Sequence, residues 1–250
     1  MSDFQRVTLV TGGARGLGLA TARALAEAGC VVIIGARDKT LGEAAANYLR
    51  KDDLQAESVM LDVTNPAHRR QVADYLAATH GRLDGLVNNA GVWPDDPVDA
   101  TICSNTAATI AERTVRDTFE VNFFAPLLLT QALLPLLAKS EAARIVNVSS
   151  NLASNALHSD SSSTAWDTKR FAHSASKAAL NSLTTQLAHA LRDTSIKVNP
   201  AHPGWVRTMM GGPDAPLDDR EGCHSSVMFA MLGENGPTGG FFYKHETVPW

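Results

Sequence analysis

Short apolar runs alternate with longer amphipathic stretches along most of the chain. The apolar runs are rich in Val and Ile, and several are apolar at every position, which is typical of strands buried on both faces of a parallel sheet. The pattern predicts strands at residues 7–11, 31–36, 56–61, 85–87, 144–149, 196–199 and 240–243. Helices are predicted between them at residues 17–28, 41–51, 67–79, 110–138 and 174–192.

This alternation predicts a fold of the α/β class, in which helices cover both faces of a doubly wound parallel sheet of about seven strands. Crossovers between parallel strands are right-handed, so the strands should wind outward from the first one in both directions. The whole chain, residues 1–250, is long enough for one such Rossmann-fold domain. Ligands of these sheets bind outside the carboxyl ends of the strands, and the functional residues are therefore expected there.

Three polar or irregular segments interrupt the rhythm, and each follows a predicted strand. Residues 92–109 and the inserted loop 151–168 are long for connections in a compact domain, and such loops are commonly functional. Residues 203–236 are rich in Pro, Gly and Met and are predicted to form a small helical flap over the substrate. We expect all three segments to meet at the carboxyl edge of the sheet.

Composition excludes several classes of partner. The net charge of −4 and the pI near 6.0 show no excess of basic residues, so nucleic acid is not an expected partner. The sequence has no run of about 18 apolar residues and no leader-like start, so no membrane contact is predicted. Three widely spaced cysteines predict no disulfide framework and favour a reducing cytoplasm. The spacing of the histidines matches no metal-ligand motif, and no metal site is expected.

A glycine-rich turn follows the first predicted strand and opens the first helix. It reads Thr-Gly-Gly-Ala-Arg-Gly-Leu-Gly from residue 11 to residue 18. Glycines in this pattern let the backbone approach a pyrophosphate, which binds at the N-terminus of the helix. The residues of the turn predicted to hold a dinucleotide are Gly12, Ala14, Arg15, Gly16, Leu17 and Gly18.

The end of the second predicted strand indicates which nucleotide binds. A site for NAD usually has a carboxylate there, which accepts hydrogen bonds from the ribose hydroxyls. This chain has Ala36 followed by Arg37, so no carboxylate repels a 2′-phosphate and a guanidinium is available to bind it. Arg15 adds a second cation on the same side, and the predicted cofactor is NADP(H). Asp62 and Val63, after the third strand, are expected at the adenine edge.

Further motifs make the chain similar to a known family. They are Asn88-Asn89-Ala90-Gly91, Asn122, the pair Ser149-Ser150, and Lys177 early in a helix. Together with the glycine turn they resemble the short-chain dehydrogenase/reductase family over essentially the whole chain. Residues 203–208, Pro-Gly-Trp-Val-Arg-Thr, and the tail from residue 236 resemble the carbonyl-reductase branch.

The resemblance implies hydride transfer between a nicotinamide and a carbonyl carbon. It implies that Asn89 supports the central strand, that Asn122 anchors a proton-relay water, and that Ser150, or else Ser149, holds the substrate oxygen. Lys177 would bind the nicotinamide ribose. The remaining implied cofactor contacts are Ala90, Gly91, Pro203, Gly204, Val206 and Thr208, the last near the carboxamide.

One position departs from the family pattern. The family has Tyr-x-x-x-Lys, whereas this chain has His173-Ser-Ala-Ser-Lys177, so the tyrosine that supplies the proton is absent. Tyr243 follows the last predicted strand and would reach the carboxyl edge only if the tail folded back, so no replacement tyrosine is expected. The i, i+4 spacing places His173 and Lys177 on one face of their helix.

Three roles for His173 remain open. It could act as the general acid, although the neighbouring Lys177 ammonium disfavours an imidazolium. The reaction could instead need no acid, as in reduction of an imine or iminium carbon, or in a non-redox cyclisation or isomerisation. The chain could also be an inactive NADP-binding protein. Loss of a general acid usually costs about 10²–10⁴-fold in rate, which favours a substrate that does not need one.

The remaining expectations concern the substrate and assembly. Trp93 and Trp205, with Ser150 and His173, are expected to line an apolar pocket for a small but bulky substrate. The interval between Ser150 and His173 is longer than the common family spacing. In the resembling branch, such an insertion covers the helix face that pairs subunits, which favours a monomer over a homo-oligomer.

Overall fold

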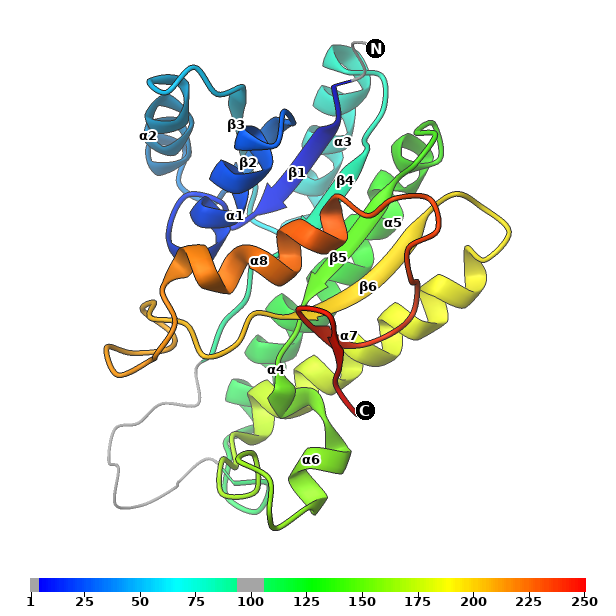
Figure 1. Ribbon diagram of the computed structural model, residues 1–250. Helices are drawn as coiled ribbons and strands as arrows, with labels where there is room; N and C mark the ends of the chain where they lie inside the picture. Colours follow the sequence, from blue (N-terminus) through cyan, green and yellow to red (C-terminus); the bar gives the residue numbers. More distant parts are fainter. Residues whose placement is uncertain (1–4, 94–105) are drawn as a thin grey trace.

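A parallel sheet forms the centre of the computed structural model, which describes residues 5–93 and 106–250 (Figure 1). The spatial order of the strands is β3-β2-β1-β4-β5-β6-β7-β8. The strands are β1 Val7–Thr11, β2 Val31–Ala36, β3 Ala56–Met60, β4 Gly85–Asn88, β5 Arg144–Val148, β6 Lys197–His202, β7 Phe242–Tyr243 and β8 Glu246–Thr247. The prediction of a doubly wound parallel α/β sheet is confirmed.

Strand β8 is an addition to the prediction. It runs antiparallel to β7, with Phe242 opposite Thr247, and closes the edge of the sheet through a tight turn. Lys244 in this turn has a φ of 54°, in the left-handed region. A two-residue strand is too short to leave a periodic pattern in the sequence, which is why the prediction missed it.

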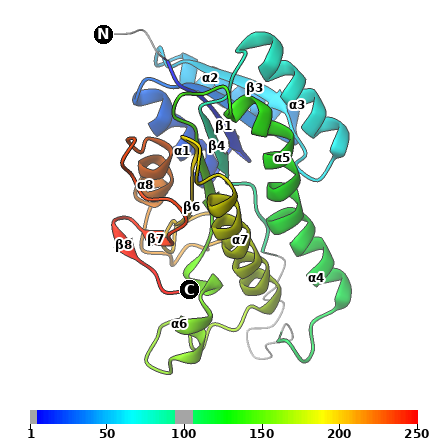
Figure 2. The same ribbon diagram turned by 90° about the vertical axis from the view of Figure 1, so that its right-hand side faces the viewer.

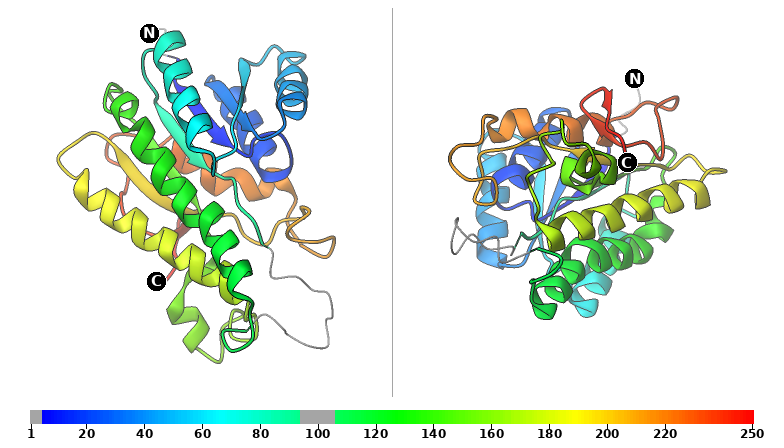
Figure 3. Two further views of the ribbon diagram at one scale, coloured as in Figure 1. Left: turned by 180° about the vertical axis from the view of Figure 1, so that it is seen from behind. Right: turned by 90° about the horizontal axis from the view of Figure 1, so that it is seen from below.

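Helices cover both faces of the sheet (Figures 2 and 3). Helices α1 Gly16–Glu27, α2 Lys39–Arg50 and α8 Asp219–Ala230 share one core with one side of the strands. Helices α3 Pro66–Thr79, α5 Ala125–Leu137 and α7 Phe171–Ala190 pack on the other side. The strands are buried between the two cores, as their continuous apolar runs require.

The predicted helix at 110–138 is divided by a change in hydrogen bonding. It consists of α4 Glu112–Phe119, a π-helical turn at Glu120–Phe124, and α5. The combined stretch Glu112–Leu137 is long and apolar enough to cross a membrane, and it alone passes that test among the described residues. Its α5 part buries Leu129, Leu133 and Leu137 in the core, which accounts for its apolar composition.

The segments predicted as an inserted loop and as a helical flap both contain helices. The insertion 151–168 includes the 3-10 turn Asn151–Ala153 and helix α6 Asn155–Ser159. The range 203–236 is not one flap, because its second half contains α8, which packs on α1 and the sheet. Only residues 203–218 remain for a flap. Most of the predicted loop 92–109, namely residues 94–105, lies outside the described residues.

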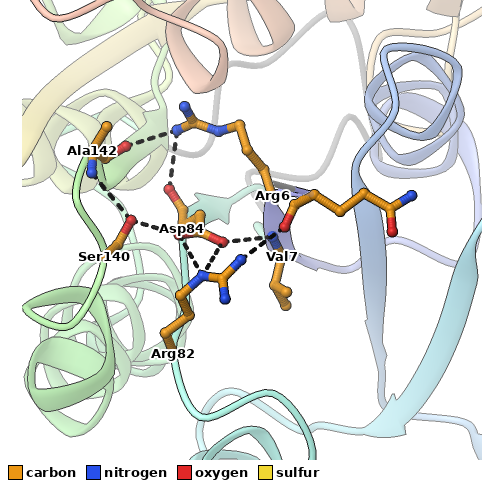
Figure 4. Close-up of polar contacts among 7 residues, drawn as sticks. Arg6, Val7, Arg82, Asp84, Ser140 and Ala142 are labelled. Carbon is orange, nitrogen blue, oxygen red and sulfur yellow. Dashed lines mark hydrogen bonds and ion pairs between the residues drawn. The ribbon is translucent and has the colours of Figure 1, made fainter. Parts of the chain in front are cut away.

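A buried carboxylate ties the strands together at the amino edge of the sheet (Figure 4). Asp84 is fully buried and accepts hydrogen bonds from the backbone N–H of Val7, from Arg82 Nε and from Ser140 Oγ. Arg6 Nη2 donates to the carbonyl oxygens of Asp84 and of residue 142. The start of β1 is thereby joined to the segments that lead into β4 and β5.

We expect Asp84→Ala to lower the free energy of unfolding by about 2–4 kcal/mol, because several buried donors would lose a charged acceptor. Urea denaturation measures this loss. The matched control is Asp117→Ala on the surface of α4, where the ion pair with Arg113 is exposed and should contribute about 0–1 kcal/mol. Equal losses in the two variants would contradict a structural role for the Asp84 network.

Candidate active site

The residues predicted to form a site lie in segments that leave the carboxyl ends of the strands. The segments after β1, β4, β5 and β6 carry the glycine turn, residues 89–93, Ser149-Ser150 and residues 203–208. Strands β1 and β4 are neighbours, but the chain leaves them toward helices on opposite faces. Such a switch in winding opens a crevice, which is where open α/β sheets bind ligands.

The glycine turn adopts backbone angles and contacts that require glycine. Gly12 and Gly16 have φ angles of +64° and +50°. A Cβ atom at Gly18 would lie 2.3 Å from the carbonyl oxygen of Gly12 and 2.5 Å from Asn89 Nδ2, so no side chain fits there. Ala14 and Leu17 are half-buried and pack against the core beneath α1. The backbone at the start of α1 is left bare, as an approaching pyrophosphate requires.

Hydrogen bonds hold the ends of β1 and β4 in fixed positions. The Thr11 hydroxyl donates to the carbonyl oxygen of Val87 at 3.3 Å and accepts from the N–H groups of Asn89 and Ala90 at 3.0 and 2.9 Å. The side chain of Asn89 donates to the carbonyl oxygen of Thr11 at 2.8 Å. The segment after β4 is thus fastened to the start of the glycine turn.

Two exposed arginines flank the place expected for a 2′-phosphate. Ala36 at the end of β2 is buried, and Arg37 directly after it is exposed. Arg15, also exposed, caps the start of α1, and its Nη1 lies 3.3 Å from Met209 Sδ. No acidic side chain occupies position 36, so the donors available at this end of the crevice fit a phosphate.

Asp62 and Val63 follow β3 on the same side of the crevice. Burial alone would raise the pKa of Asp62, but hydrogen bonds from Thr64 and the charge of Arg37 hold it below its usual value. The Val63 side chain is buried in the core, so only its backbone is available to a nucleotide.

The segment after β6 crosses the glycine turn. A Cβ at Gly16 would lie 3.7 Å from Thr208 Cγ2, which places Thr208 beside the turn. Gly204, after Pro203, has a φ of +83° and changes the chain direction there, and Val206 pairs with Leu217 in an isolated bridge. These residues close the crevice over the end of β1.

Lys177 projects from α7 into the buried floor of the crevice. Its Nζ donates to the carbonyl oxygen of Val148 at 2.6 Å. A Cβ at Gly91 would lie 3.6 Å from this Nζ and 3.3 Å from Asn122 Oδ1, so the three predicted residues come together. Burial lowers the pKa of Lys177 to about 8.

Asn122 lies inside the π-helical turn and is fully buried. Its Oδ1 accepts from the Val92 N–H at 2.9 Å, and its Nδ2 donates to the Val92 carbonyl oxygen and to Ser176 Oγ, both at 3.0 Å. The side chain therefore fixes the backbone just before Trp93. A π-turn shifts the helical hydrogen bonds and often marks a functional position. An anchored relay water at Asn122 remains a prediction.

The two serines after β5 differ in their surroundings. Ser149 is buried, and its hydroxyl donates to Asn181 Oδ1 at 2.7 Å, on the core-facing side of α7. Ser150 is half-buried, and its Oγ accepts from the Leu152 N–H at 3.2 Å in its own turn. Ser150 is the better placed of the two to meet a substrate. The contact with Asn181 was not predicted, although its i, i+4 spacing from Lys177 indicated the same helix face.

His173 is buried at 4% exposure and stacks on Trp93, with ring centroids 4.6 Å apart and an angle of 21° between the planes. Burial and the neighbouring Lys177 lower the pKa of His173 to about 3, against a small opposing effect of the Val92 backbone. The imidazole is therefore neutral at physiological pH. Trp93, predicted for the substrate pocket, packs face to face on this ring.

Trp205 does not join this group. It is 57% exposed, and its indole N–H donates to the Gly211 carbonyl oxygen within its own loop at 2.8 Å. Of the residues predicted to line the substrate pocket, Trp93 and His173 are in contact, and the pocket itself remains a prediction.

The expectation that the tail stays away from the carboxyl edge is wrong. Strand β7 pairs in parallel with β6, so Tyr243 lies opposite His202, with ring centroids 5.2 Å apart. The Tyr243 hydroxyl would lie 3.3 Å from a Cβ at Gly204. His202 Nδ1 is within reach of the N–H groups of Asn151 and Gly204, at 3.3 and 3.4 Å, and burial lowers the pKa of His202 to about 4.

The strand order, the glycine turn and the crevice define a nucleotide-binding α/β protein. The profile of the family described as short chain dehydrogenase matches residues 6–216. The chain belongs to this family, and it is an enzyme of the oxidoreductase class that the family represents.

Named relatives agree with this assignment. Carbonyl reductase [NADPH] 1 of Rattus norvegicus is 31% identical over 288 aligned residues that cover all of both chains. Short-chain dehydrogenase/reductase 1 of Saponaria officinalis is 31% identical and covers 98% of this chain and 96% of its own.

Solved structures give the same result. NADPH-bound carbonyl reductase from chicken fatty liver superposes with a TM-score of 0.84 at 27% identity, covering 98% of this chain and 99% of its own. Salutaridine reductase of Papaver somniferum has a TM-score of 0.79 at 27% identity, with 96% and 99% covered. Structures with bound NADP or NADPH recur among the neighbours, and the predicted NADP(H) cofactor is confirmed.

We expect Arg37→Ala to weaken NADPH binding by roughly 10–100-fold, because one charge-assisted contact to the 2′-phosphate is lost, and to change NADH binding little. Fluorescence titration with both nucleotides measures the two dissociation constants. Arg113→Ala, at an exposed arginine on α4, is the control and should alter neither. An equal loss for NADH would show that Arg37 acts through the fold.

We expect Lys177→Met to stabilise the cofactor-free protein by about 1–3 kcal/mol at pH 7, because a buried ammonium is removed. Between about pH 8 and 10.5 the unfolded state binds more protons than the native state, so wild-type stability rises with pH and the advantage of the variant disappears. Urea denaturation across this range measures the effect. Lys139→Met, at an exposed lysine, should show no such convergence.

Proposed function

We propose that the chain is an NADPH-dependent reductase that transfers hydride to a carbonyl or iminium carbon of a small, bulky, apolar substrate. The observation that carries the proposal is that His173 is buried, neutral and stacked on Trp93; the Tyr-x-x-x-Lys resemblance assigns this position to the family's tyrosine. Membership of a family that includes NADPH-dependent carbonyl reductases supports the hydride chemistry.

The protonation state of His173 favours the iminium substrate within this class. Hydride addition to a ketone produces an alkoxide, which needs a proton from a nearby acid. Hydride addition to an iminium carbon produces a neutral amine and needs none. A histidine with a pKa of about 3 offers no imidazolium at neutral pH, and the loss of an acid usually costs about 10²–10⁴-fold in rate.

The other site residues would keep their binding roles. In this proposal Ser150 binds the polar end of the substrate, and Lys177 binds the nicotinamide ribose. Asn122 fixes the segment that carries Trp93. One face of the Trp93 ring stacks on His173. The other face would contact the ring system of the substrate. Bound NADPH supplies the hydride.

Assembly and location belong to the same proposal. We place the protein in the cytoplasm, because its three widely spaced cysteines suggest no disulfide framework. We expect a monomer, because the insertion 151–168 lies just before α7, one of the helices through which relatives in this family pair their subunits. A homo-oligomer is the alternative, and size-exclusion chromatography with light scattering separates the two.

The proposal is tested by assaying NADPH oxidation with panels of ketones and cyclic imines, using wild type, His173→Phe and His173→Tyr. We expect the wild type to reduce cyclic imines that are protonated to iminium ions at the assay pH faster than ketones, because hydride addition to an iminium carbon needs no acid from the enzyme. His173→Phe should keep imine reduction within a few-fold, since a phenyl ring preserves the stack on Trp93. His173→Tyr should raise ketone reduction by about 10²-fold or more.

A control variant addresses the other donor near the site. Tyr243→Phe should leave imine reduction unchanged, because the proposal uses no acid from the tail. A loss of about 10²-fold in Tyr243→Phe would instead make Tyr243 the proton donor and overturn this account. Product formation without NADPH oxidation would identify a non-redox cyclase or isomerase, and NADPH binding without any turnover would identify a binding protein.

A further inference from the structure

His158 on α6 bridges two distant parts of the insertion. Its Nδ1 lies 3.0 Å from the carbonyl oxygen of Ala165, and its Nε2 lies 3.0 Å from the carbonyl oxygen of Leu152. The ring thus joins the first turn after β5 to the last turn before α7. The side chain is half-buried between them.

The two partners determine the charge of the ring. A backbone carbonyl oxygen only accepts hydrogen bonds, whereas a neutral imidazole has one N–H donor and one acceptor nitrogen. In either neutral tautomer one of the two contacts would set a lone pair against a carbonyl oxygen. Only the imidazolium, with two N–H groups, donates to both.

The Leu152 peptide connects this bridge to the active site. Its N–H donates to Ser150 Oγ at 3.2 Å, and its carbonyl oxygen accepts from His158 Nε2. The Leu152 side chain is itself buried, at 8% exposure. Leu152 therefore links the His158 bridge to the hydroxyl of Ser150 through two successive peptide groups of one short turn.

We propose that His158 is a positioning residue whose imidazolium fixes the turn carrying Ser150 and closes the insertion 151–168. Its importance for catalysis rests on the proposed role of Ser150; the bridge itself does not.

Charged groups around His158 belong mainly to the insertion and the residues that follow it. Lys169 Nζ donates to the His158 carbonyl oxygen at 3.1 Å and lies 4.9 Å from the centre of the Trp166 ring. The carboxylate of Asp160 accepts from the N–H and hydroxyl of Ser162. Asp167 and Arg170 complete the charged residues of this region.

The two other elements against α6 carry no ionisable side chains. The 3-10 turn is Asn-Leu-Ala, at residues 151–153, and the tail segment at residues 248–250 is Val-Pro-Trp. The tail touches α6 where the N–H of Ala156 donates to the Trp250 carbonyl oxygen at 2.9 Å, and Trp250 stacks on Phe241. Figures 1 and 2 show the chain end beside α6.

The sign of the pH effect follows from the bridge. The closed insertion binds a proton that the open one does not need, so it is favoured at acidic pH. Its advantage is lost once the ring gives up that proton. Ser150 should accordingly be less well fixed at alkaline pH.

The direct test is hydrogen exchange of residues 151–170 in the full chain at about pH 5.5 and about pH 8.5, corrected for intrinsic rates. We expect protection to fall by about tenfold at the higher pH, which corresponds to one charge-assisted hydrogen bond. His158→Phe should show the low protection at both pH values. His158→Lys, whose charge persists, should keep protection at both.

Two further variants separate the contacts. His158→Asn retains a donor near the Nδ1 position and His158→Gln one near the Nε2 position, so each should keep part of the protection. His189→Asn, at an exposed histidine near the end of α7, is the matched control and should leave the segment unchanged. NADPH titration of every variant verifies that the cofactor domain is folded.

Nitrogen NMR of the histidine rings gives an independent readout. In the closed insertion both ring nitrogens of His158 should carry a proton, because both face carbonyl oxygens. A single neutral tautomer at the lower of the two pH values, or equal protection in wild type and His158→Phe at both pH values, would overturn the proposal. Neither measurement needs turnover, so a protein without reductase activity would refute the proposed function and leave this test intact.

If the chain is a reductase, kcat/KM for its substrate should fall with the same pH dependence, and His158→Lys should remove that part of the fall. Binding of NADPH should not follow this profile, because the glycine turn and the arginines lie outside the insertion. A pH profile that is identical in wild type and His158→Lys would show that His158 does not position Ser150.

Discussion

The hydrogen bonds of Thr11 fix the glycine turn and the segment after β4 relative to each other. Its hydroxyl joins the end of β1 to the end of β4, the two strands between which the winding of the sheet reverses. Asn89 makes the same connection in the opposite direction. Because the glycine turn leaves one strand and the segment leading to Trp93 leaves the other, this junction fixes the cofactor crevice and the segment that carries Trp93 relative to each other.

Burial then decides the chemistry inside that crevice. His173, Lys177 and Asn181 follow one another at helical spacing on the buried face of α7. Burial lowers the pKa of both His173 and Lys177, because charges are poorly solvated there. The stack on Trp93 reinforces this for His173. This position of α7 therefore presents a neutral ring covered by Trp93.

Two segments beyond the alternating strands and helices lie together at the end of the sheet that carries β6 and β7. They are the insertion 151–168 and the tail that follows β7. The insertion after β5 and the tail after β7 meet at α6, and the tail also places Tyr243 beside His202. Hydrogen bonds run from the insertion to the Ser150 turn through Leu152. The segments after β5 and β7 are thus held by contacts separate from those that hold the glycine turn.

The sequence by itself determined the sheet, the glycine turn and the NADP(H) preference. These depend on local rules: strands buried on both faces must be apolar, a backbone that approaches a pyrophosphate needs glycine, and Ala36-Arg37 leaves no carboxylate. Tertiary structure alone decided that Trp93 covers His173, that α8 belongs to the core, that the tail returns to the carboxyl edge, and that His158 bridges two carbonyl oxygens. Each of these depends on which loops meet in space, and no periodicity within one segment encodes a contact with another.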